Sequence, residues 1–173
     1  MRPDRIRRIV TAGLPHLRRL VLRPSRSQLR ASQYMLRFQI PGLVSKDLAK
    51  DDFARLFDLV REWSPGWIWP DSSAAAVKLA FAEPERLRAA LSYYRALPAA
   101  LFRAECWRYL LKPLQVPARV IYGERDGAML ARTFQGQEHL FARGLDLVEL
   151  PACGHFMQLE MPETFARLAI EYL

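Results

Sequence analysis

The chain has 173 residues, of which 51% are hydrophobic and 25% are charged. This composition excludes a disordered chain and is sufficient for one domain with a substantial core. There is no apolar run of about 18 residues and no signal-peptide segment at the amino terminus, so we expect a cytoplasmic protein without a membrane span. Cys106 and Cys153 are too few for a disulfide framework or a metal site, and we expect no cofactor.

The positive charge is concentrated near the amino terminus. The net charge is +8, and residues 1–45 carry ten arginines but only one acidic residue, Asp4. A basic segment is a common feature of nucleic-acid-binding proteins. Here apolar residues interrupt the arginines every few positions, and no helix-turn-helix, zinc-finger or RNA-recognition pattern accompanies them. We therefore expect no nucleic-acid partner.

The first two thirds of the chain predict one strand followed by helices. Residues 5–12 predict a buried strand, because Ile9 and Val10 form the continuous apolar pair typical of parallel sheets. Residues 51–63 predict an amphipathic helix with Asp51 as its N-cap. Breaks at proline and glycine separate the other predicted helices, which cover residues 17–22, 28–38, 74–81, 84–97 and 101–111.

The pattern changes after Pro117. Residues 118–123 predict a compact strand that ends at a glycine, and a helix of about ten residues is expected beyond Asp126, towards Phe141. Residues 145–150 predict a second strand, and a helix then starts at Pro162. The order is therefore one strand, about 100 residues of helix, and then strand, helix, strand, helix, which predicts an α/β fold.

Two polar residues follow the ends of these last two strands. Asp126 comes just after the strand at 118–123, and His155 follows the strand at 145–150. The carboxyl ends of parallel strands meet at one edge of the sheet, so both side chains are expected there. A histidine that acts as a general base needs an acidic partner to hold its tautomer. The alternatives are a structural histidine in a turn, and an aspartate that caps the helix beyond Gly127.

Five segments follow one another along the chain: residues 2–16, Tyr34-Met-Leu-Arg-Phe-Gln-Ile-Pro-Gly42, Leu91-Ser-Tyr-Tyr-Arg95, residues 116–126 and Cys153-Gly-His155. Together they resemble the α/β-hydrolase superfamily, in its epoxide-hydrolase and haloalkane-dehalogenase branch. The resemblance covers essentially the whole chain. It implies about three parallel core strands with a helical cap inserted after the first: residues 1–16 as the first core strand, 17–112 as the cap and return helix, and 113–173 as the carboxy-terminal core.

The resemblance also implies an activity, the hydrolysis of a small apolar epoxide, haloalkane or ester through a covalent intermediate. His155 would be the base that activates water, with Asp126 as its acid. Tyr94 and Tyr34 would be cap residues that donate hydrogen bonds to an epoxide oxygen. The sequence departs from the family at Arg37, where a tyrosine is usual, and Tyr94 could instead be part of ordinary cap packing.

The nucleophile of this family sits on a Gly-x-(Ser/Asp)-x-Gly elbow. Neither this elbow nor the oxyanion-hole His-Gly motif occurs in the sequence. We therefore expect a carboxy-terminal portion of a hydrolase that is inactive alone and that binds a small apolar substrate if completed. The alternative is a truncated, non-catalytic interaction protein, and the exposed first strand favours self-association.

Overall fold

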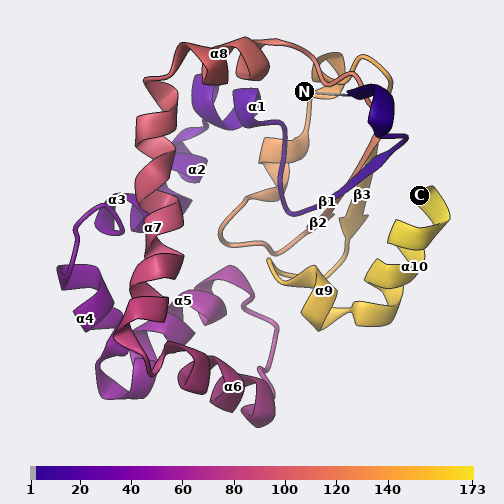
Figure 1. Ribbon diagram of the computed structural model, residues 1–173. Helices are drawn as coiled ribbons and strands as arrows, with labels where there is room; N and C mark the ends of the chain where they lie inside the picture. Colours follow the sequence, from indigo (N-terminus) through magenta and orange to yellow (C-terminus); the bar gives the residue numbers. More distant parts are fainter. Residues whose placement is uncertain (1–2) are drawn as a thin grey trace.

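The computed structural model describes residues 3–173 and contains one parallel β-sheet of three strands (Figure 1). The strands are β1 (Ile9–Ala12), β2 (Ala118–Gly123) and β3 (Leu145–Leu150), in the order β1-β2-β3. Ile9 pairs with Ala118, which in turn pairs with Leu145. The predicted α/β class, with three parallel strands, is confirmed.

All the regular elements between β1 and β2 are helical, and residues 17–112, which contain them, are here named the helical insertion. In Figure 1 the long helix α7 runs from α6 to α8, which leads the chain back towards the sheet. Within the described part of the chain, no helix is long and apolar enough to cross a membrane. The helical insertion contains α1 (Leu17–Leu22), α2 (Arg26–Ala31), α3 (Gln33–Arg37), α4 (Leu43–Ala49), the 3-10 turn η2 (Asp51–Phe53), α5 (Ala54–Trp63), α6 (Asp71–Phe81), α7 (Pro84–Leu101) and α8 (Ala104–Leu111).

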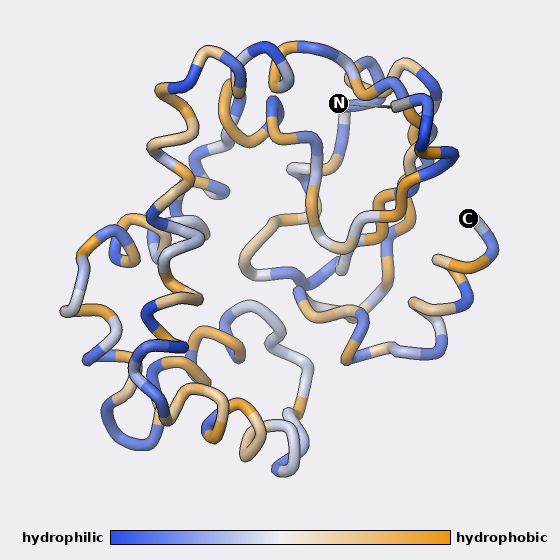
Figure 2. The backbone as a smooth tube through the Cα atoms, in the orientation of Figure 1, coloured by the Kyte–Doolittle hydropathy of each residue, from blue (hydrophilic) through white to orange (hydrophobic). Residues whose placement is uncertain are grey.

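The remaining elements cover the two faces of the sheet. One face packs against the 3-10 turns η3 (Ala131–Phe134) and η4 (Glu138–Leu140), and the other against α9 (Met157–Glu160) and α10 (Pro162–Tyr172). Hydrophobic residues follow the strands in Figure 2, as expected for a sheet covered on both faces. The buried residues are Ala118, Val120, Tyr122, Phe134, Leu140 and Phe141 on the first face, and Ile121, Leu150, Cys153 and Met157 on the second.

The helical insertion has a hydrophobic core of its own. The apolar face of α5 contributes Leu59 to it, and α7 contributes Leu87 and Leu91. Tyr34 and Tyr94 pack at its border, partly exposed. The helices thus form a second layer, whose position relative to the sheet sets the position of both tyrosines.

The first strand is shorter than predicted. Residues 5–12 were expected to form it, but Arg5 belongs to the 3-10 turn η1 (Pro3–Arg5) and β1 begins at Ile9. The reason is the extent of the pairing with β2. The Ile9 amide donates to the carbonyl of Pro117, directly before β2, and in the described part of the chain the register with β2 starts at Ile9. A strand persists only where its backbone groups are satisfied.

Two helix predictions are also wrong. Instead of a helix beyond Asp126, the chain forms η3 and η4, separated by Gly136 with a φ of +70°, which a continuous helix does not allow. Asp51 is not an N-cap, because residues 51–53 all have positive φ and α5 begins only at Ala54. The Phe53 side chain is 9% exposed and packs in the core of the helical insertion. Its backbone has a left-handed conformation, with a φ of +65°.

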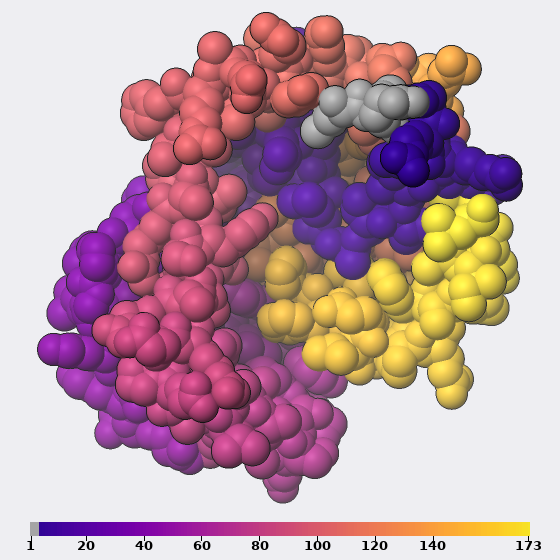
Figure 3. Space-filling model, in the orientation of Figure 1, coloured from indigo at the N-terminus to yellow at the C-terminus, as the bar shows by residue number. Residues whose placement is uncertain are grey.

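The sheet leaves β1 with a free edge. Ile9 and Gly13 donate their amides towards β2, so the alternate amides of Val10 and Ala12 point to the open side. Just before β1, the Arg8 guanidinium donates to the Tyr172 carbonyl at 2.5 Å and lies over the Tyr172 ring. Figure 3 shows this amino-terminal segment (indigo) beside α10 (yellow). Arg8 thus ties the start of β1 to the last helix without covering its edge.

Candidate active site

The structure brings Asp126 and His155 together at the carboxyl edge of the sheet. Asp126 lies just beyond β2 and His155 in the loop between β3 and α9. The Nδ1 atom of His155 is 2.8 Å from Oδ2 of Asp126. The aspartate side chain is fully buried, whereas that of the histidine is 28% exposed. One residue is therefore sealed from water and the other can reach a ligand.

The second carboxylate oxygen of Asp126 holds its own loop. Oδ1 accepts the amides of Ala128 at 2.8 Å and Met129 at 2.7 Å. Asp126 therefore does both of the things considered for it: Oδ1 caps the turn, and Oδ2 contacts the histidine. With Asp126 ionised, a neutral His155 donates Nδ1–H to the carboxylate and leaves Nε2 as a free acceptor. This is the tautomer that a general base requires.

Tyr34 and Tyr94 lie near this pair, in the helical insertion. Their ring centroids are 6.0 Å apart, and the Tyr34 ring is 4.8 Å from that of Trp63, which lies 5.5 Å from the His155 ring. Arg37, where the resemblance to the family led us to expect a tyrosine, is exposed. Tyr34, one helical turn earlier, is the half-buried aromatic residue on the inner side.

Both tyrosines are held in their protonated form. Burial raises the pKa of Tyr34 far above its ordinary value, with smaller contributions from Tyr94 and Asp126. Burial also raises the pKa of Tyr94, and Tyr93 adds to the effect. Because a phenol with a raised pKa keeps its proton, each hydroxyl is a hydrogen-bond donor throughout the neutral range.

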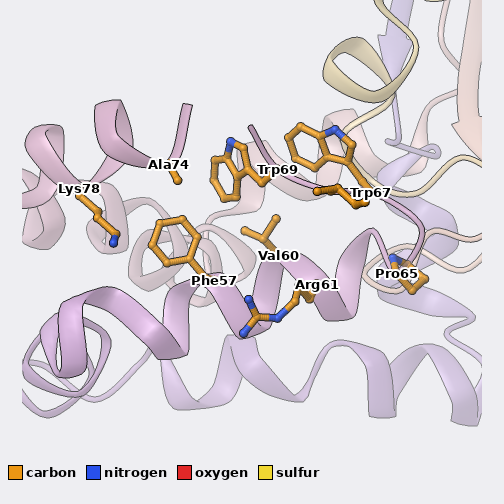
Figure 4. Close-up of a pocket in the computed structure, with 9 residues that line it drawn as sticks. Phe57, Val60, Arg61, Pro65, Trp67, Trp69, Ala74 and Lys78 are labelled. Carbon is orange, nitrogen blue, oxygen red and sulfur yellow. The ribbon is translucent and has the colours of Figure 1, made fainter. Parts of the chain in front are cut away.

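The tryptophans near this region fall into two groups. Trp63 faces His155, whereas Trp67 and Trp69 stack on each other with centroids 5.4 Å apart. The latter pair lines a hollow of about 500 Å³ on α5 and α6, whose other wall includes Phe57 and Val60 (Figure 4). This hollow contains neither His155 nor Asp126, so it is separate from the acid–base pair.

The sequence did not reveal three polar side chains that hold the two loops, of which Ser64 and Gln28 are buried and Glu160 is partly exposed. Ser64, at the end of α5, accepts the His155 amide at 2.9 Å and donates to Glu160 at 2.8 Å. Gln28, in α2, donates to the Ala128 carbonyl and accepts the Leu130 amide. No sequence signal marks Ser64 or Gln28, because their partners are about 90 to 100 residues away. Glu160 is close to His155 in the sequence, but the pattern around it indicated only the start of a helix.

The site offers no evident position for a metal ion. Within residues 3–173, no group of three or more histidine, cysteine, aspartate or glutamate side chains is arranged to hold one. Cys153, next to the histidine loop, is 1% exposed. Burial, followed by the charge of Glu160, raises the pKa of its thiol to about 12, so it is an unreactive packed residue at neutral pH.

Comparison with known proteins identifies this fold. No family model matches the chain. The AB hydrolase superfamily protein YfhM of Bacillus subtilis is 25% identical over 174 residues, covering 99% of this chain and 59% of the relative. The chain thus spans less than two thirds of the length of this curated relative.

Solved structures agree on the fold. An epoxide hydrolase of Bacillus megaterium with a bound inhibitor superposes with a TM-score of 0.74 at 20% identity, covering 99% of this chain and 62% of the other. A putative epoxide hydrolase of Klebsiella pneumoniae gives 0.72 at 22% identity, covering 98% and 59%. The Cif epoxide hydrolase of Acinetobacter nosocomialis gives 0.70 at 17% identity, covering 97% and 54%.

The protein therefore has an α/β-hydrolase fold. The chain spans 54–62% of the length of the proteins compared, and it contains three parallel strands and a helical insertion. The likeness to the epoxide-hydrolase branch, predicted from the sequence, is confirmed.

Proposed function

We propose that this chain provides the general base and its acidic partner for an α/β-hydrolase that opens small apolar epoxides. The observation that carries the proposal is the 2.8 Å contact between His155 Nδ1 and a carboxylate oxygen of the fully buried Asp126. A buried aspartate that orients a partly exposed histidine is the arrangement of a base in nucleophilic catalysis. Haloalkanes and esters are alternative substrates that the same pair could serve.

In the proposed reaction, a carboxylate nucleophile outside this chain attacks the epoxide carbon and the ring C–O bond breaks. The resulting oxyanion takes a proton that solvent supplies through the hydroxyl of Tyr34 or Tyr94, and the product remains bound as an ester. His155 Nε2 then removes a proton from water as the water oxygen attacks the ester carbonyl. The C–O bond to the product breaks, and the proton on Nε2 passes to the departing alcohol oxygen. Asp126 stabilises the imidazolium that exists between these two proton transfers.

We propose that the helical insertion acts as a cap, with Tyr34 and Tyr94 as donors to the epoxide oxygen. Two features support this role: both hydroxyls keep their protons, and the Trp63 ring bridges Tyr34 and His155. A donor that meets the developing oxyanion accelerates ring opening, because it stabilises charge present only in the transition state. Arg37, which is exposed, has no part in this proposal.

A chimera tests the function. The portion of the Bacillus subtilis relative that this chain does not cover would be fused to it, and the purified product assayed on styrene oxide, a chloroalkane and a nitrophenyl ester. We expect hydrolysis by the chimera and none by the 173-residue chain alone, which has no nucleophile elbow. A cooperatively folded chimera that turns over none of the three substrates would contradict the proposal.

A further inference from the structure

The loop that carries His155 has little regular structure, and its backbone is held by side chains from other elements. Three consecutive amides bind only two side chains. The Gly154 amide donates to Oε2 of Glu160 at 2.9 Å, the His155 amide to Oγ of Ser64 at 2.9 Å, and the Phe156 amide to Oε1 of Glu160 at 3.1 Å. Ser64 Oγ itself donates to Glu160 Oε1 at 2.8 Å, so the serine side chain links the helical insertion to this loop.

The backbone beside Ser64 touches both catalytic loops. The Trp63 carbonyl accepts the His155 amide and the Gly127 amide, each at 3.1 Å, and Gly127 directly follows Asp126. The approach is so close that a Cβ atom on Gly154 would lie 2.5 Å from the Ser64 Cα, and one on Gly127 would lie 2.0 Å from the Glu62 carbonyl oxygen. Segment 62–64 therefore fits between the acid loop and the base loop.

We infer that Ser64 is a positioning residue for His155. Ser64 is 1% exposed, so water does not satisfy its hydroxyl. The hydroxyl is held instead by its hydrogen bonds to the His155 amide and to Glu160. By fixing the amide of His155, it fixes the direction of the Cα–Cβ bond and hence the aim of Nδ1 at Asp126. This inference rests on the proposed role of His155 as the base.

The tautomer ratio of the His155 imidazole tests the positioning role of Ser64, and measuring it requires no substrate or turnover. In ¹⁵N-labelled protein at about pH 9, above the ordinary histidine pKa of about 6.5, the two ring nitrogens report the fraction that carries the proton on Nδ1. His16 is an internal reference, because its Nδ1 accepts the Arg18 amide and its proton therefore lies on Nε2. The His155 signals are assigned by their loss in His155→Ala.

We expect wild-type His155 to carry its proton on Nδ1, and Ser64→Ala to raise the Nε2–H fraction about three- to tenfold. That range is the effect of one hydrogen bond on an equilibrium. Ser45→Ala is the matched control: this serine lies in α4, in the same insertion, and its hydroxyl bonds only the nearby Gly42 carbonyl. The control and the His16 signals should not change.

Glu160→Gln provides a second variant in case Ser64→Ala does not fold. It keeps the side-chain shape but removes the charge and replaces one acceptor oxygen with an NH₂ group, which cannot accept from the loop. The tautomer should therefore shift in the same direction. A wild-type tautomer in a folded Ser64→Ala or Glu160→Gln protein would overturn the inference. Because no substrate is involved, an inactive chimera would count against the proposed function and leave this result standing.

Discussion

His155 Nδ1 lies 2.8 Å from Asp126 Oδ2, although 29 residues separate them in the sequence. The two loops meet because β2 and β3 are parallel neighbours whose carboxyl ends open on the same edge. The other oxygen of Asp126 is used by two backbone amides, so the carboxylate cannot rotate away from the histidine without losing both.

Asp126→Asn is expected to remove this orientation in the active chimera. The amide retains an acceptor for the turn but not the charge that stabilises an imidazolium, and kcat should fall by a factor on the order of 10²–10⁴. Asp146→Asn is the control, because Asp146 pairs with Arg119 near the opposite end of the strands. Equal kcat values for Asp126→Asn and wild type would show that the pair is only structural.

Tyr34→Phe and Tyr94→Phe are expected to act on epoxides selectively. Each removes one donor to the oxyanion that forms in ring opening, so epoxide turnover should fall about tenfold or more while ester turnover falls less. Tyr109→Phe, on α8 and 47% exposed, is the matched control. An equal loss on both substrates would indicate that the tyrosines serve packing alone.

The two cysteines should differ in reactivity. Cys153 is buried, with a pKa raised to about 12, so a thiol reagent at pH 8 should modify Cys106 within minutes and Cys153 only after unfolding. Mass spectrometry of the labelled native protein decides this. Rapid modification of native Cys153 would show that the histidine loop opens freely.

The same pKa predicts a pH dependence of stability. In the folded state the thiol holds its proton more tightly than at its ordinary pKa of 9.0. Its stabilising contribution is therefore complete below about pH 9 and is lost as the pH rises towards 12. Cys153→Ala should reduce the loss of unfolding free energy over that range, measured by urea titration at several pH values. An unchanged pH profile would be evidence against the burial of the thiol.

The fold and the acid–base pair were predictable because their signals are local. A short apolar run that ends at Gly123 gave β2 correctly, and an alternating run that ends before Pro151 gave β3. The residues beyond their ends gave Asp126 and His155. The helix after Asp126 could not be excluded, because its apolar residues have helical spacing and only the conformation at Gly136 breaks it. Ser64 and Gln28 were not predictable at all, because a buried polar residue is defined by partners distant in sequence.

The open edge of β1 predicts self-association of the chain alone. The free amides of Val10 and Ala12, with the neighbouring Ile6 at 49% exposure, offer a site for another strand. Size-exclusion chromatography with light scattering should show dimers or larger species. We expect Ala12→Lys, at the exposed position of β1, to shift them towards monomer, because charged side chains on an edge strand disfavour pairing. A wild-type monomer with a cooperative melt would mean that this edge is covered.

The most direct test of the central claim is to trap the covalent intermediate in the chimera. His155→Ala should still form the ester with an epoxide but should fail to hydrolyse it, because water lacks its base. Intact-protein mass spectrometry should then show the protein with one substrate mass added, at near-stoichiometric amount, and no such species in the chimera with His155 intact. Full turnover by folded His155→Ala, without any accumulated adduct, would contradict the role assigned to His155.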